Sequence, residues 1–198
     1  MREVAGYYVN PRAATAAAGG CFGPAMGWLL RKDAASAAVL ESAAKKQPVF
    51  LITAAGILKD AGRADGAALL AAEAEKSSVR MGRGLEELAL LYQDMGRYPE
   101  SLSITRGLLA ADPENPRLNN DLGVLLVFLK RDTEAEAALI KAANHHRAPV
   151  SAQLNLAALY ARRGDKARAA DYYRLALDNP ALPAAQRAAV SEAAAGRF

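Results

Sequence analysis

The two histidines are the first residues to consider for chemistry, because a pair of imidazoles can bind a metal ion or move a proton. His145 and His146 are sequence neighbours in a predicted loop, and we expect their side chains to point apart rather than converge. The pair therefore predicts loop surface rather than a metal site.

Carboxylate pairs are the second class of candidate. Glu86 with Glu87, and Glu134 with Glu136, could serve as general acid and base, but both pairs fall in predicted helices rich in solvated charge. The sequence has no GxxxxGK[ST] phosphate loop, no GxGxxG after a strand and no HExxH zinc motif. We therefore expect no enzyme activity, no catalytic residue, no cofactor, no metal and no small-molecule substrate.

Cys21 is the single cysteine, so the chain has no internal disulfide and no cysteine-based zinc site. The uncharged run 13–30 around it has the character of a secretory or lipoprotein signal, with Cys21 as the lipidated residue. Its apolar residues are mainly alanine and glycine, however, and Pro24 interrupts it. We expect a cytoplasmic protein. The alternative is a periplasmic lipoprotein anchored to the outer membrane, and a membrane is a partner only if Cys21 is lipidated.

Composition predicts closely packed helices. Hydrophobic residues make up 52% of the chain and aromatic residues only 6%, because much of the apolar content is alanine, which favours helices but buries little area. The 25 Lys+Arg and 21 Asp+Glu leave a net charge of +4 that is spread along the chain. Nucleic acid is therefore not an expected partner. The alternative, a nucleic-acid adaptor, would depend on the arginines Arg162, Arg163, Arg168 and Arg174.

A repeat is visible when the stretch LNLAALYARRGDKARAADYYRLALDNP (154–180) is compared with the chain at steps of 34 residues. Equivalent positions carry matching residue classes without insertion or deletion. They are a large site (Leu58, Tyr92, Leu126, Tyr160), a small site (Ala55, Ala89, Gly123, Ala157), a turn (Gly62, Gly96, Lys130, Gly164), the start of a second helix (Ala67, Ser101, Ala135, Ala169) and its end (Ala74, Leu108, Ala142, Ala176).

The pattern thus predicts that each repeat forms two helices joined by a tight turn. The small site lets the second helix approach, the large site fills the space between helices, and glycine permits the left-handed turn. Lys130 replaces that glycine in the third repeat, so we expect this turn to be strained. In the second repeat, Thr105 occupies a position where a large apolar residue is expected.

This pattern resembles the tetratricopeptide repeat (TPR) family over residues 48–183, as four repeats: 48–81, 82–115, 116–149 and 150–183. The resemblance implies an all-α protein, a right-handed α-solenoid of helix-turn-helix repeats. Residues 184–198 are then expected to form a capping helix, and 33–47 a degenerate half-repeat helix. Residues 1–32 are expected to be a flexible, low-complexity segment, with a degenerate signal as the alternative.

In this family the first helices line a concave groove that holds a peptide or a partner protein. The resemblance places ten residues of this chain there: Arg83, Glu86, Leu90, Gln93, Arg117, Asn120, Val124, Phe128, Leu154 and Arg162. Leu90, Val124, Val127 and Phe128 are expected to form an apolar strip along it. For Phe128 two interpretations stay open: an exposed anchor, or a core residue packed under the Lys130 turn.

The function predicted from the sequence is therefore a non-catalytic scaffold that binds a protein or peptide, in the assembly of a bacterial complex. A preorganised array loses little entropy on binding, which favours affinity from a few anchors. An exported TPR lipoprotein that assists pilus or secretion-system assembly is the first alternative, and the nucleic-acid adaptor is the second.

Overall fold

The computed structural model describes residues 48–60, 62–81 and 84–196 of the 198-residue chain. Every regular element in this part is an α-helix, so the all-α prediction is confirmed. The helices are α3 (Pro48–Asp60), α4 (Ala64–Met81), α5 (Leu85–Asp94), α6 (Tyr98–Ala111), α7 (Pro116–Phe128), α8 (Asp132–Ala143), α9 (Val150–Arg162), α10 (Lys166–Asp178) and α11 (Ala184–Ala194).

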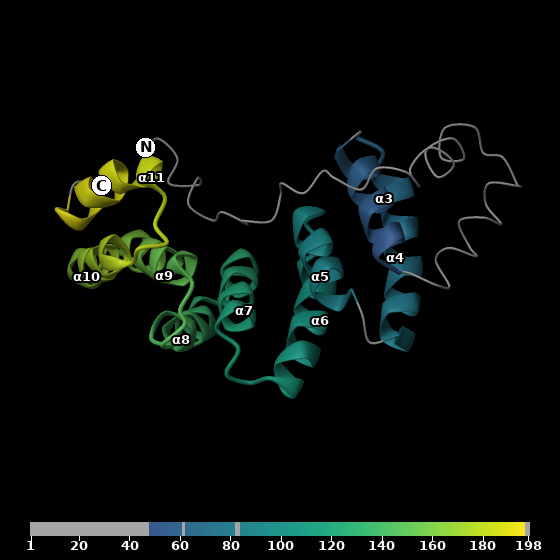
Figure 1. Cartoon of the computed structure of the whole chain (residues 1–198), viewed down its shortest axis with the longest axis horizontal. Coiled ribbons are helices and arrows are strands. Elements are labelled where there is room, and N and C mark those ends of the chain that lie inside the picture. Colours follow the sequence, from purple (N-terminus) through teal and green to yellow (C-terminus); the bar gives the residue numbers. More distant parts are fainter. Residues whose placement is uncertain (1–47, 61, 82–83, 197–198) are drawn as a thin grey trace, which may run out of the picture. The chain divides into compact units, whose positions relative to one another are not determined.

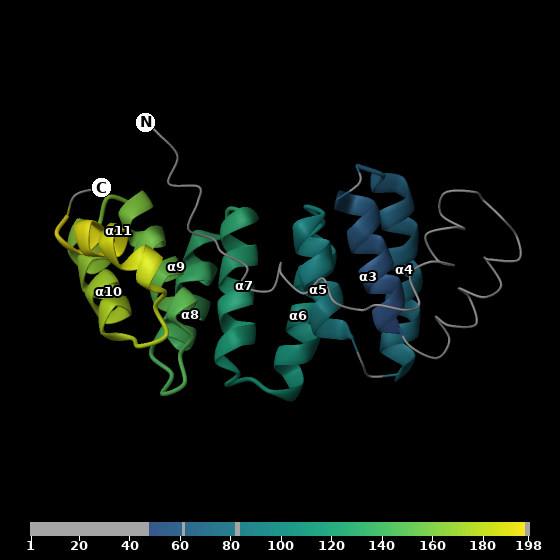
Figure 2. The same cartoon turned by 45° about the horizontal axis from the view of Figure 1, so that its top comes forward.

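The fold consists of two compact units that divide within α6, between Ile104 and Thr105. In the first unit α3 packs against α4, and both contact α5. In the second unit α7 packs against α8, α8 and α7 both contact α9, α9 packs against α10, and α10 carries α11 (Figures 1 and 2). Within each unit, helices therefore pack mainly on their neighbours in sequence.

The positions that the 34-residue step selects form the interior. Buried residues occupy three sites in all four segments: the large site (Leu58, Tyr92, Leu126, Tyr160), the small site (Ala55, Ala89, Gly123, Ala157) and the start of the second helix (Ala67, Ser101, Ala135, Ala169). At the end of the second helix, Ala74, Ala142 and Ala176 are buried, whereas the larger Leu108 is half-buried. The apolar pattern of the sequence therefore locates the core.

The four turns share one hydrogen-bonding geometry. The turn residue has φ of 73° at Gly62, 72° at Gly96, 61° at Lys130 and 81° at Gly164. The next residue donates its backbone N–H to the carbonyl of the large-site residue, over 2.8 to 3.0 Å. This bond closes the helix C-terminus as in a Schellman motif. Lys130 adopts the left-handed conformation that suits glycine, so the expected strain lies in its backbone.

Tyrosine hydroxyls join successive hairpins. In the first unit Tyr92 donates a 2.7 Å hydrogen bond to Glu75 of α4. In the second, Tyr160 donates a 2.8 Å bond to Glu136 of α8, and the guanidinium of Arg163 also pairs with this carboxylate. Burial raises the pKa of both phenols, and the acceptor carboxylates add to the shift. These bonds connect helices that the apolar contacts already bring together.

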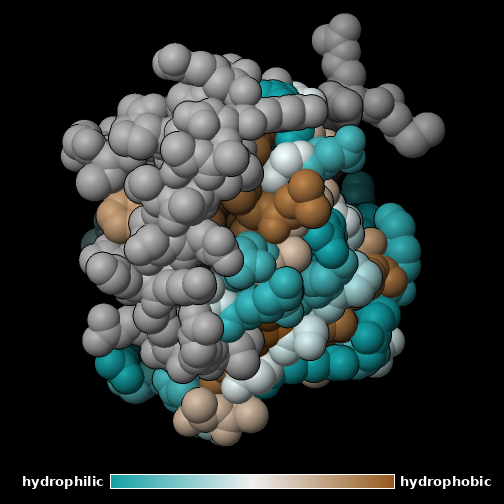
Figure 3. Space-filling model, turned by 90° about the vertical axis from the view of Figure 1, so that its right-hand side faces the viewer, coloured by the Kyte–Doolittle hydropathy of each residue, from teal (hydrophilic) through white to brown (hydrophobic). Residues whose placement is uncertain are grey.

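Exposed apolar side chains are few among the described residues. On α3 and α4 they are Val49, 47% exposed, and Leu69, 73% exposed. Figure 3 looks onto the end of the first unit and shows apolar residues beside polar ones there. On α11, Val190 and Ala194 are buried whereas Ala185 and Ala189 are exposed.

Candidate partner-binding surface

The described groove residues lie on α5, α7 and α9, the first helices of three hairpins. In the first unit, Glu86 of α5 is exposed, and Leu90 and Gln93 are partly exposed. Arg83 lies outside the described residues, as do Cys21 and the segments 1–32 and 33–47. In the second unit the remaining six residues lie on α7 and α9: Arg117, Asn120, Val124, Phe128, Leu154 and Arg162.

The expected apolar strip is wrong where it relies on Val124 and Val127, because both are buried. Leu154 of α9 is buried as well, and so is Asn120 of α7. The reason is that α7 packs against both α8 and α9, which leaves these positions little exposed surface. They support the helix pair rather than present themselves to a partner.

Phe128, Arg117 and Arg162 are exposed. Phe128 stands at the last residue of α7 with 40% of its surface accessible, so it is a surface residue rather than a core residue. Arg117 is exposed in the first turn of α7. Arg162 pairs with Asp132 over 2.6 Å, which links α9 to the start of α8. Phe128 is therefore the one predicted groove residue of this unit that offers a large apolar surface.

A cluster of buried amides was not predicted. Within the described part of the chain, the buried amide side chains are Asn119 and Asn120 on α7 and Gln153 and Asn155 on α9. Asn155 Nδ2 donates a 2.9 Å hydrogen bond to Asn120 Oδ1 across the two helices. The 35-residue separation of the pair is one longer than the repeat, so a search at the repeat step does not align them.

One atom of this cluster lacks a hydrogen-bond donor. The Oδ1 of Asn155 is buried and accepts no hydrogen bond. The other amides are engaged: Asn119 donates to the carbonyls of Pro113 and Asn115, and Gln153 accepts from Asn179. A buried acceptor without a donor costs about 1–3 kcal/mol.

The two histidines do not point apart, contrary to the sequence prediction. The ring centroids of His145 and His146 lie 4.2 Å apart, with the planes tilted by 33°. The residues occupy a turn between α8 and α9 rather than an extended segment, so successive side chains need not diverge. Within the described residues there is no cluster of three or more His, Cys, Asp or Glu side chains that could hold a metal ion.

The arginines considered for nucleic acid are paired with carboxylates. Arg162 pairs with Asp132, Arg163 with Glu136, Arg168 with Asp165, and Arg174 with Asp171. Their charge is therefore largely neutralised within the protein, which disfavours a phosphate-backbone surface here.

None of the described helices combines the length and apolar character needed to cross a membrane. In comparisons with known proteins, no family model matches this chain and no curated protein matches it.

Proposed function

We propose that this chain is a non-catalytic interaction scaffold, built as a right-handed TPR-type solenoid, that binds an extended peptide segment of a partner protein along its first helices. Support for the repeat architecture comes from four helical hairpins at a 34-residue step, each closed by the same turn hydrogen bond. Helices that pack on their sequence neighbours are the basis of such arrays.

The observation that carries the binding proposal is the exposure of Phe128, an aromatic side chain at the last residue of α7 with 40% of its surface accessible. An accessible aromatic side chain is a common anchor for a partner. Phe128 would hold an apolar side chain of the bound peptide.

Selection from a random peptide library displayed on phage tests the proposal. We expect the wild-type chain to enrich peptides that Phe128→Asp binds at least about tenfold more weakly, because a charge replaces an apolar anchor. The matched control is Leu175→Asp on α10, since Leu175 is 41% exposed and Phe128 is 40% exposed.

The control should bind the selected peptides like the wild type, and the helical circular dichroism of both variants should match it. Equal weakening by both substitutions in folded protein would contradict a site at Phe128. Enrichment of no peptide by the wild type would contradict the function.

A further inference from the structure

Unpaired arginines mark a second site in the unit that begins at Thr105. Residues 105–196 contain nine arginines, and seven of them bind a carboxylate or a backbone carbonyl: Arg106, Arg131, Arg162, Arg163, Arg168, Arg174 and Arg187. Within this range, the guanidinium groups of Arg117 and Arg147 alone have no such partner. Both residues line the same pocket.

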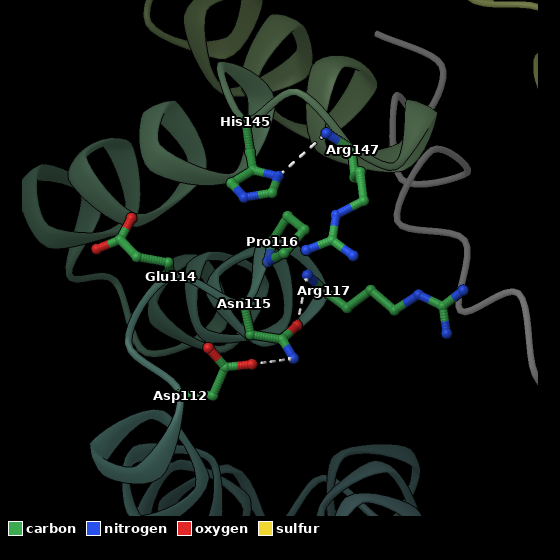
Figure 4. Close-up of a pocket in the computed structure, with 7 residues that line it drawn as sticks. All are labelled: Asp112, Glu114, Asn115, Pro116, Arg117, His145 and Arg147. Atoms are coloured by element: carbon green, nitrogen blue, oxygen red, sulfur yellow. Dashed lines mark hydrogen bonds between the residues drawn. The ribbon is translucent and has the colours of Figure 1, made fainter.

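The pocket lies between two loops on one side of the unit and has a volume of about 420 Å³. The loop before α7 and the first turn of that helix form one wall, and the loop between α8 and α9 forms the other (Figure 4). The guanidinium of Arg147 reaches from the second loop toward the start of α7, and the side chain of Arg117 extends on the same side (Figure 4). Two cations from different elements therefore lie at one edge of the pocket.

The acidic residues of the pocket are already engaged. Asp112 accepts a 3.0 Å hydrogen bond from Asn115 Nδ2, and Glu114 forms a 2.9 Å ion pair with Lys141. Neither carboxylate is paired with Arg117 or Arg147. The guanidinium groups of Arg117 and Arg147 can therefore donate hydrogen bonds to a bound anion.

His145 also lines the pocket. Its Nδ1 accepts a 3.1 Å hydrogen bond from the backbone N–H of Arg147 (Figure 4). A neutral imidazole that accepts at Nδ1 carries its proton on Nε2. The imidazole can therefore donate from Nε2 without changing its charge.

We propose that this pocket binds a phosphate group. Two planar guanidinium forks suit an anion with several acceptor oxygens and close to two negative charges. A carboxylate has only two oxygens and one charge. The phosphate is either free in solution or carried on a phosphorylated side chain, and the two sources share the chemistry that the pocket recognises. This pocket does not include Phe128 and does not rest on the proposed function.

Calorimetric titration of the full chain with inorganic phosphate, at constant ionic strength, tests the proposal. We expect saturable binding at one site, and a loss of about tenfold or more in Arg117→Ala and in Arg147→Ala, since each removes charge-assisted hydrogen bonds. The matched control is Arg174→Ala, which removes an exposed arginine of the same unit that pairs with Asp171 and should bind like the wild type.

Parallel titrations identify the source of the phosphate. Tighter binding of a phosphoserine peptide than of inorganic phosphate, with no binding of the unphosphorylated peptide, would assign a phosphorylated partner; equal binding would assign free phosphate. Acetate binding as tightly as phosphate would overturn the proposal. So would unchanged affinity in both folded pocket variants, or an equal loss in Arg174→Ala.

Discussion

Gly123 of α7 lies so close to Leu139 of α8 that a Cβ atom built on the glycine would come within 2.5 Å of Leu139 Cγ and 2.7 Å of its Cδ2. The contact is inside the core, where Leu139 is fully buried. The equivalent residues in the other three segments are alanines, so the sequence alone suggests that alanine is acceptable here.

We expect Gly123→Ala to lower the free energy of unfolding by about 1–3 kcal/mol, because the added methyl overpacks the helix pair. Urea denaturation gives the measurement. In Gly107→Ala, where a Cβ has nothing within 4 Å, the same change should raise stability by up to about 1 kcal/mol through helix propensity. In a Leu139→Ala background, Gly123→Ala should not lower the free energy of unfolding, because the side chain that the methyl would overlap is absent. An equal cost in both backgrounds would exclude this contact as the cause.

Lys130 leads to a prediction of opposite sign. It holds φ of 61° in a turn whose equivalents are glycines, and the left-handed conformation costs about 1–2 kcal/mol for a residue with a Cβ. We expect Lys130→Gly to raise the thermal midpoint, by a net gain of about 0.5–1 kcal/mol after the larger entropy of glycine in the unfolded chain. Gly164→Ala, at φ of 81° with open space around it, should lower stability by about 1 kcal/mol. An unchanged midpoint for both would show that these turns carry no strain.

Glu136 should make stability depend on pH. Its hydrogen bond from Arg163, and secondly that from Tyr160, lower the pKa of this carboxyl from its ordinary value of 4.5. A group with a lower pKa in the folded state contributes its full stability at neutral pH and loses it as the pH falls through the folded pKa. We expect Glu136→Gln to reduce the difference in unfolding free energy between pH 7 and about pH 3 by about 1 kcal/mol.

The comparison isolates one residue, because Glu100, Glu134 and Asp165, whose pKa values are also lowered, are present in both proteins. Tyr160→Phe serves as the second variant. It should keep most of the pH dependence, because Arg163 is the larger cause. The same pH dependence in wild type and Glu136→Gln would refute this role.

Asn115 caps the N-terminus of α7. Its Oδ1 accepts hydrogen bonds from the backbone N–H groups of Arg117, at 3.1 Å, and Leu118, at 3.2 Å. We expect Asn115→Ala to cost about 1 kcal/mol and to speed hydrogen exchange of these two amides. Asn115→Ser keeps an N-cap acceptor and should retain most of the protection. Unchanged exchange in the alanine variant would show that the cap is dispensable.

The helix order and the core were predictable because they depend on local signals. Alanine-rich segments with apolar residues one turn apart form helices, and a glycine such as Gly96 ends the first helix of its hairpin. The large and small sites are buried because each helix must cover its apolar face with its neighbours. These requirements recur every 34 residues, so the sequence displays them.

The binding surface was less predictable because burial depends on which helix covers which face. Val124 has the residue type of an anchor, yet it is buried on α7, which packs against both α8 and α9. Pairing of Asn155 with Asn120 requires two helices to meet at an offset that a fixed repeat step does not reveal. The contact between the rings of His145 and His146 depends on the path of a short turn. Sequence periodicity therefore predicts the contacts that recur in every repeat but not the contacts that occur only once.

The segment with Gly123 and Lys130 has a practical consequence for redesign. Averaging the four segments would place alanine at position 123 and glycine at position 130. The packing against Leu139 and the left-handed turn imply that the first replacement harms the protein and the second helps it. A consensus sequence is therefore a poor guide for this segment. Gly123 is required by its contact with Leu139, whereas no described contact requires a lysine rather than a glycine at position 130.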